Sequence, residues 1–170
     1  MQFSINAGVE WKGLDFSIVF QGAGKRTVWR EKSTWRIPMR TTYQNGSNQF
    51  IGNTWTPENT GAYYPALTNK SELNNYNYQC SSWSVEDGSY LRLNTLTLGY
   101  TLPKSMLQKA GISNLRVYGS IYNVFTITGY SGIDAEVSTS TSTKTYPQLG
   151  MDWGTYPRAR SFVLGVNLSF

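Results

Sequence analysis

Two carboxylates, Glu10 and Asp15, flank a Lys12-Gly13 pair near the start of this 170-residue chain. A two-residue turn at that pair would place the two acidic side chains opposite one another, as in a general acid–base pair. Directly opposed like charges destabilise a sheet, however. We therefore expect either a compensating cation from outside the chain or solvation of both charges, rather than catalysis here.

A second acidic group suggests a calcium site. It consists of Glu86, Asp87, Asp134 and Glu136. These residues lack the dense spacing of oxygen ligands found in known calcium loops, so ordinary turns explain them better. The chain has no histidine and a single cysteine, Cys80, which excludes the common metal-site patterns and an intrachain disulfide. We expect no cofactor, no bound metal and no enzymatic activity.

Aromatic side chains gather in two long stretches that lack regular periodicity. Exposed rings of this kind can stack on sugar rings or anchor a protein interface. Three interpretations stay open: the rings pack the loops on each other, which we favour, or they contact a partner protein, or they contact a substrate. The candidate residues are Trp55, Tyr63, Tyr64, Tyr130, Tyr146, Trp153 and Tyr156.

Six basic residues crowd one short stretch of a chain whose net charge is +5; they are Lys25, Arg26, Arg30, Lys32, Arg36 and Arg40. Trp29 and Trp35 lie among them, and basic residues mixed with aromatics can bind nucleic acid. A solvated basic rim is the simpler explanation, so we expect no nucleic-acid partner. Contact with anionic lipid headgroups is a further alternative.

The elements that must position these residues are strands, because apolar and polar residues alternate almost throughout. The odd positions are apolar in residues 2–11 and the even positions in residues 14–20. A hairpin over Lys12-Gly13 sets apolar residues opposite one another: Trp11–Leu14, Val9–Phe16, Ala7–Ile18 and Ile5–Phe20. A one-residue slip would break all of these pairs, so the register is well specified.

Three further strands are predicted over about 89–102, 114–128 and 158–170. The leucines of the first change parity near Asn94, which predicts a bulge there, and Asn123 interrupts the second. Short connections, at 12–13 and about 103–113, alternate with long ones, at about 24–88 and 129–157; a helical turn is expected to open at Pro103. Short turns at one end and long loops at the other are typical of outer-membrane barrels.

The strands have the length and composition of membrane-spanning strands. A spanning strand needs roughly 9–11 residues, whereas soluble strands average about 5–6. Aromatic residues of the apolar faces collect at the short-turn end, as a membrane-interface girdle would: Trp11, Phe16, Tyr100 and Phe170. Open sheet edges are not tolerated in hydrocarbon, so we expect an all-β fold of five antiparallel spanning strands within a larger closed barrel. The alternative is a soluble β-sandwich module that binds glycans.

Four segments carry a family resemblance: WTPENTGAYYPAL (55–67), VEDGSYLRLNTLTLGYTLPKSML (85–107), LRVYGSIYNVFTITGYSGIDAEV (115–137) and YPRARSFVLGVNLSF (156–170). The segment EWKGLDFSIVFQG (10–22) fits the hairpin that precedes them. In these features the chain resembles the carboxy-terminal portion of the SusC/RagA-like TonB-dependent outer-membrane transporters of Bacteroidetes. Ala135 departs from the pattern, since the family often has Pro there, and this affects only loop rigidity.

The resemblance implies that residues 1–170 form the last five strands of a 22-stranded barrel with an amino-terminal plug domain. It implies uptake of oligosaccharides or peptides, driven by TonB–ExbB–ExbD, with a SusD-like surface lipoprotein over the extracellular loops. The plug and TonB box would lie upstream, so the chain is not expected to transport alone, and Glu10 and Asp15 would face the plug.

The same resemblance orients the chain in the outer membrane. The loops at about 24–88 and 129–157 would be extracellular, with the basic stretch near lipopolysaccharide headgroups. The carboxyl-terminus would be periplasmic. A terminal strand ending in Phe170 resembles the signal read by the barrel assembly machinery, so we expect the carboxyl end to be native and the amino end to be truncated.

Overall fold

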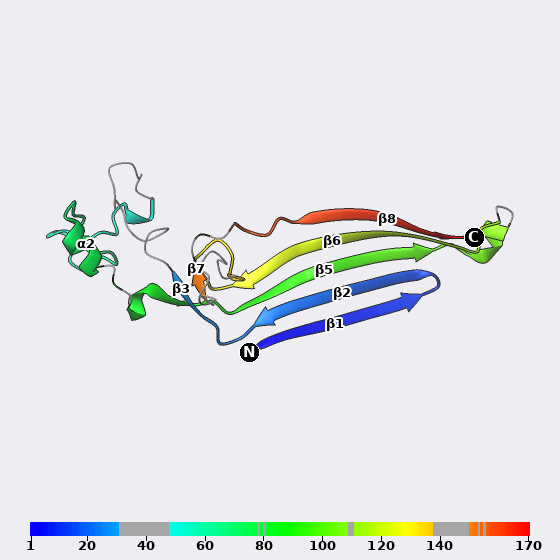
Figure 1. The fold of residues 1–170 in the computed structure, drawn as a ribbon, viewed down its shortest axis with the longest axis horizontal. Coiled ribbons are helices and arrows are strands. Elements are labelled where there is room, and N and C mark those ends of the chain that lie inside the picture. The colour runs from blue at the N-terminus through cyan, green and yellow to red at the C-terminus, as the bar shows by residue number, and fades with distance from the viewer. Residues whose placement is uncertain are drawn as a thin grey trace, which may run out of the picture.

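Five long antiparallel strands form one sheet in the order β1-β2-β5-β6-β8 (Figure 1). The computed structural model describes residues 1–30, 48–77, 79, 81–108, 111–137, 150–152, 154 and 156–170. The long strands are β1 (Gln2–Trp11), β2 (Leu14–Ala23), β5 (Tyr90–Thr101), β6 (Asn114–Thr128) and β8 (Ser161–Ser169). Each pairs with the next long strand along the chain, so the sheet is a meander. The all-β fold class is confirmed.

The first hairpin has the predicted register. Trp11 lies opposite Leu14, Val9 opposite Phe16, and the pairing continues without a shift to Gln2 and Ala23. Lys12 and Gly13 have φ angles of 48° and 87°, the left-handed values that a type I′ turn requires at both central positions. Lysine rarely adopts this conformation, so the cross-strand apolar pairs, rather than the turn sequence, determine the hairpin.

A bulge at Asn94 brings two sets of leucines onto one face of β5. The leucines on either side of it pair with the apolar positions of β2: Leu91 with Gly22, Leu93 with Phe20, Leu96 with Ile18 and Leu98 with Phe16. The extra residue in the bulge reverses the alternation of faces once, so the odd-numbered and the even-numbered leucines point to the same side. β6 shifts at the same level, where Asn123 has a φ of 52°. Both predicted interruptions are confirmed.

The sheet has one apolar face and one polar face. The apolar face exposes large side chains on every strand; Trp11 is 64 % exposed, Phe162 71 % and Leu164 89 %. Val163 points the other way, because it lies opposite Ser120 on the polar face. None of the helices that the structure describes is long and apolar enough to cross a bilayer.

A small second sheet lies beyond the end of the long sheet that is remote from the Lys12-Gly13 turn (Figure 1). Its order is β4-β3-β7, with β3 (Thr27–Arg30) antiparallel to β4 (Val85–Asp87) and parallel to β7 (Met151–Asp152). The first long connection also contains η1 (Asn48–Phe50), α2 (Ser71–Asn77) and η2 (Ser82–Ser84). The short connection after β5 holds α3 (Lys104–Leu107), which opens at Pro103 as predicted.

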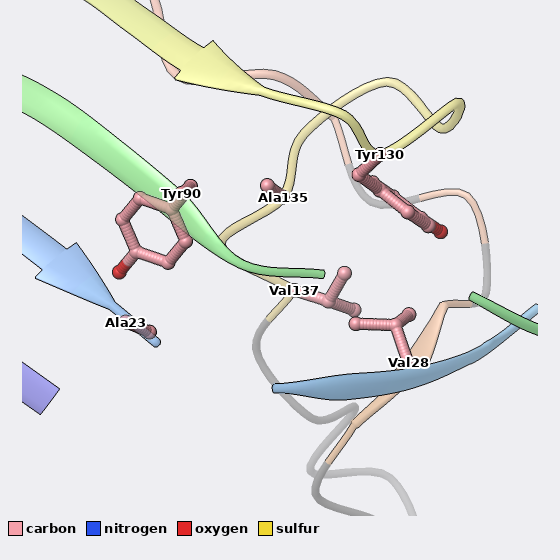
Figure 2. Close-up of a cluster of buried hydrophobic side chains, with 6 residues drawn as sticks. All are labelled: Ala23, Val28, Tyr90, Tyr130, Ala135 and Val137. Carbon is pink, nitrogen blue, oxygen red and sulfur yellow. The ribbon is translucent and has the colours of Figure 1, made fainter. Parts of the chain in front are cut away.

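A buried apolar cluster joins the two sheets (Figure 2). Its members are Ala23, Val28, Tyr90, Tyr130, Ala135 and Val137. Ala23 and Tyr90 belong to the polar side of the long sheet, and Val28, which is fully buried, belongs to β3. The other three residues belong to a segment after β6, residues 130–137, which we call the strap. The strap therefore folds back over the polar face instead of continuing away from the sheet.

Candidate functional site on the polar face

An arginine of this chain compensates the charge of the two opposed carboxylates of the first hairpin. Glu10 pairs with Asp15 across the turn, as predicted. Arg116 of β6 donates from Nε to Asp15 Oδ1 over 2.8 Å and from Nη2 to Asp15 Oδ2 over 2.5 Å. This bidentate pair reaches from β2 to β6 across β5. The compensating cation thus comes from within the sheet, and the interpretation that Glu10 and Asp15 face a plug stays a prediction.

Two glycines make room for this pair and for the ring beside it. Gly99 of β5 lies beneath the ion pair, where an added Cβ would come within 2.6 Å of Arg116 Nη2. The Arg116 guanidinium also lies 4.8 Å from the centre of the Tyr118 ring, and that ring covers Gly165, whose Cβ would meet the phenol oxygen at 2.5 Å. The ion pair borders a hollow of about 520 Å³ that Glu10, Lys12 and Thr101 complete. The turn end of the polar face is therefore polar and open.

A buried arginine organises the opposite end of the polar face. Arg92 of β5 is 4 % exposed. It donates from Nη2 to Asp134 Oδ1 over 2.5 Å, from Nη1 to Glu136 Oε2 over 2.9 Å and from Nε to Thr126 Oγ1 over 2.8 Å. Arg158 donates from Nη2 to the second oxygen of Glu136 over 2.8 Å. Two charges of each sign balance in this cluster, which holds the strap on the sheet.

Asp134 is held in its charged form. Burial acts to raise the pKa of Asp134, but hydrogen bonds from the backbone amides of Glu136 and Arg158, together with the charge and hydrogen bond of Arg92, outweigh it and lower the pKa below its ordinary value. The carboxylate therefore stays ionised at every physiological pH.

Further contacts fasten the strap to the small sheet. The Tyr130 hydroxyl donates to Asp152 Oδ2 of β7 over 2.5 Å, and Asp152 is 2 % exposed. The Ser131 hydroxyl donates to Glu86 Oε2 of β4 over 2.6 Å. Arg26, just before β3, donates from Nη2 to the Val137 carbonyl over 2.5 Å. The strap, which begins the second long connection, thus contacts both ends of the first connection and the end of the second.

These contacts account for the acidic group that suggested calcium. Glu86, Asp134 and Glu136 accept hydrogen bonds from serine or arginine, and Asp87 accepts from the amide and hydroxyl of Ser89 over 2.9 and 2.6 Å. In the part of the chain that the structure describes, no three histidine, cysteine, aspartate or glutamate side chains are grouped to hold a metal ion. The signal in the sequence for this cluster was Arg92, a charged residue within a strand of alternating apolar positions.

Three of the predicted aromatic residues come together in the first long connection. Trp55, Tyr63 and Tyr64 line a hollow of about 520 Å³ with Pro65 and Asn77. The Tyr63 and Tyr64 rings meet edge-on with centroids 5.0 Å apart. Trp55 remains 43 % exposed and Tyr63 60 % exposed, so both packing and contact with a ligand or partner stay open for them.

The remaining aromatic candidates differ in their surroundings. Tyr130 is 6 % exposed, so it packs the strap and does not present its ring to a ligand. Tyr156 is 86 % exposed. Tyr146 and Trp153 lie outside the described residues.

Three of the four aromatic residues predicted to form a girdle, Trp11, Phe16 and Tyr100, share the turn end of the apolar face. Leu14 lies between Trp11 and Tyr100, and Phe16 lies opposite Leu98. Phe170, which follows the last residue of β8, is 86 % exposed. Their place at a membrane interface stays a prediction.

The basic stretch is only partly described. The side chain of Arg26 reaches the strap, as given above, and Lys25 is exposed. Lys32, Arg36 and Arg40 lie outside the described residues, so contact of this stretch with lipopolysaccharide stays a prediction.

Comparison with known proteins identifies the family. No family model matches the chain. TonB-dependent receptor P3 of Formosa agariphila is 31 % identical over 169 residues, 97 % of this chain, and TonB-dependent receptor SusC of Bacteroides thetaiotaomicron is 29 % identical over 98 % of it. The RagAB peptide importer in its closed-closed state superposes on 99 % of the chain with a TM-score of 0.76 and 25 % identity. The chain is a SusC/RagA-like segment of a TonB-dependent receptor.

The SusC/RagA-like chain spans a small part of these relatives. It covers 16 % of the length of P3, 15 % of SusC and 17 % of the RagAB chain. The names of these relatives describe receptors and an importer, not enzymes. The predicted family resemblance is confirmed, and the agreement extends over the whole of this chain rather than over isolated motifs.

Proposed function

We propose that this chain forms part of the barrel wall of an outer-membrane nutrient importer, with its apolar face against lipid and its polar face lining the passage. One observation carries the proposal: large apolar side chains lie exposed on the same face of all five long strands. Soluble monomers rarely expose contiguous apolar patches larger than a few hundred Å². A bilayer would cover such a face without any further protein.

The position of the small sheet weighs against the soluble sandwich. In a sandwich a second sheet packs over the apolar face. Here the small sheet meets the long one through the strap, and Tyr90 and Arg92 under the strap belong to the polar face. Large side chains of the apolar side stay exposed on the first, fourth and fifth strands of the long sheet, with Val9 60 %, Ile127 62 % and Val166 61 % exposed.

Two neighbouring residues of β8 offer a matched test of this orientation. Leu164 is on the apolar face and Val163 on the polar face. In the full-length receptor, Leu164→Arg should cost about 2–4 kcal/mol near the bilayer midplane and reduce the amount of folded receptor in outer-membrane fractions. Val163→Arg should leave that amount unchanged. Equal loss for both variants would contradict the proposed orientation.

For the whole receptor, we propose import of oligosaccharides or peptides, energised by TonB–ExbB–ExbD and assisted by a SusD-like surface lipoprotein. The names of the relatives support this proposal, since they include TonB-dependent receptors, SusC and a peptide importer. The polar face, with its open hollow beside Asp15 and Arg116, suits passage of a hydrogen-bonding solute. We also propose assembly by the outer-membrane barrel machinery, which the amphipathic alternation of β8 supports.

The exposed rings of the first long connection are the surface that we assign to the lipoprotein. Aromatic residues around a hollow are typical anchors of protein interfaces. Trp55→Ala with Tyr63→Ala should weaken co-purification of the lipoprotein with the full-length receptor. Tyr76→Ala is the matched control, because Tyr76 is 73 % exposed on α2 and does not line the hollow. An equal effect of the control, or none from the double variant, would remove this assignment.

A further inference from the structure

The strap contacts several elements at the remote end of the long sheet. Its ion pairs reach Arg92 of β5 and Arg158 before β8. Its other contacts reach β4 through Ser131, β7 through Tyr130 and the residue before β3 through Val137. These partners come from β5, from both ends of the first long connection and from the end of the second.

The fastening is buried at two points, and one of them is an ion pair. Arg92 is 4 % and Asp134 9 % exposed at the sheet, and Asp152 is 2 % exposed at β7. A buried charge that loses its partner is strongly destabilising, because it can neither be hydrated nor paired. The strap is therefore either held in this arrangement or released, because a partly opened position would leave a buried charge unpaired.

The strap also lies between the small sheet and the long sheet. The small sheet joins β3 to β4 and β7, and the Trp29 amide donates to the Gly150 carbonyl over 2.7 Å. Val28 of β3 packs on Val137 of the strap (Figure 2). We call the strap together with residues 25–30, 85–89 and 150–152 the collar.

We infer that the collar is a single cooperative unit that Arg92 fastens to the sheet, so that the bases of both long connections are held or released together. Arg92 is a positioning residue: it touches the strap and Thr126, yet through the strap it fixes β3, β4 and β7. Movement of the collar relative to the long sheet then requires this cluster to open. The inference rests on the contacts of the collar and does not depend on the proposed transport function.

Hydrogen exchange of the full-length receptor, followed peptide by peptide, tests this coupling. In Arg92→Met, amides of the strap and also of residues 25–30 and 85–89 should exchange faster by at least about tenfold, since their opening becomes easier. Peptides from β1 and from residues 14–20 of β2 should not change. Arg116→Met is the matched control, because it removes the arginine that pairs with Asp15 at the turn end of the polar face, the end opposite the collar.

A second variant separates the ion cluster from general damage. Arg92→Met leaves Asp134 buried without its cation, so adding Asp134→Asn should slow the exchange of the collar relative to Arg92→Met alone. Faster exchange of the strap alone, with residues 25–30 and 85–89 unchanged, would overturn the inference. So would equal exchange in the single and double variants, or collar exchange in Arg116→Met as fast as in Arg92→Met.

Discussion

Replacing Gly99 by alanine tests the ion pair that spans three strands. The added Cβ would lie 2.6 Å from Arg116 Nη2 and closer still to Asp15. The backbone of β5 cannot move away from the ion pair, because Gly99 pairs with Asp15 of β2 on one side and with Tyr118 of β6 on the other. Gly99→Ala therefore forces the guanidinium and the carboxylate apart.

The magnitude follows from the burial of the pair. Hydrogen bonds to charged groups contribute about 1.5–3 kcal/mol, and the two side chains are 25 % and 22 % exposed, so the lower part of that range applies. Alanine in a strand recovers roughly 0.5–1 kcal/mol relative to glycine. We expect Gly99→Ala to destabilise the receptor by about 1 kcal/mol net.

Gly8→Ala is the matched control on the same polar face. Its added Cβ would meet the Phe16 carbonyl at 3.5 Å, an ordinary contact, so this variant should be neutral or slightly stabilising. The assay is guanidinium unfolding of the full-length receptor in lipid vesicles, followed by tryptophan fluorescence. In an Arg116→Met background the cost of Gly99→Ala should largely vanish. Additive losses, or equal losses for Gly8→Ala and Gly99→Ala, would refute the explanation.

Three further predictions concern the collar and the first turn. The pKa of Asp134 is lowered on folding. The difference in unfolding free energy between wild type and Asp134→Asn should therefore be constant above about pH 4 and should close as the pH falls through the lowered pKa. Unfolding midpoints from pH 7 to 3 measure this difference, and a difference that widens in acid would contradict the prediction. Tyr130→Phe leaves buried Asp152 without its hydroxyl donor, so it should cost about 1–3 kcal/mol in the same unfolding assay; no loss would show that the bond is unimportant. Gly13→Ala should reduce the yield of folded receptor, because Gly13 has a φ of 87° and its Cβ would lie 2.6 Å from the Thr101 carbonyl; a normal yield would mean that the turn can rearrange.

The long strands could be predicted because their determinants are local. The alternation that pairs Val9 with Phe16 lies within one hairpin, and only one register matches all the apolar positions. The change of parity between Leu93 and Leu96 predicted the bulge at Asn94 for the same reason. In each case a period of two, read over about ten residues, fixes which face a side chain occupies.

The polar contacts could not be predicted because they depend on distant segments. Asp15 and Arg116 are 101 residues apart in the chain, and Arg92 and Asp134 are 42 apart. The sequence shows that each has a charge, but the partner depends on strand order and on how the strap folds back. β3 and β7 are also too short for periodicity to reveal them, with four and two residues.

Spin-label accessibility at neighbouring positions of β8 tests most directly whether the apolar face meets lipid. Nitroxides would be attached to Leu164→Cys and Val163→Cys of the full-length receptor in vesicles, with Cys80 replaced by serine. We predict that the label at 164 collides with oxygen, which concentrates in lipid, more than with a water-soluble nickel reagent, and that the label at 163 does not share this preference. A label at 164 shielded from both reagents, as in the core of a sandwich, would contradict the assignment of this face to the membrane.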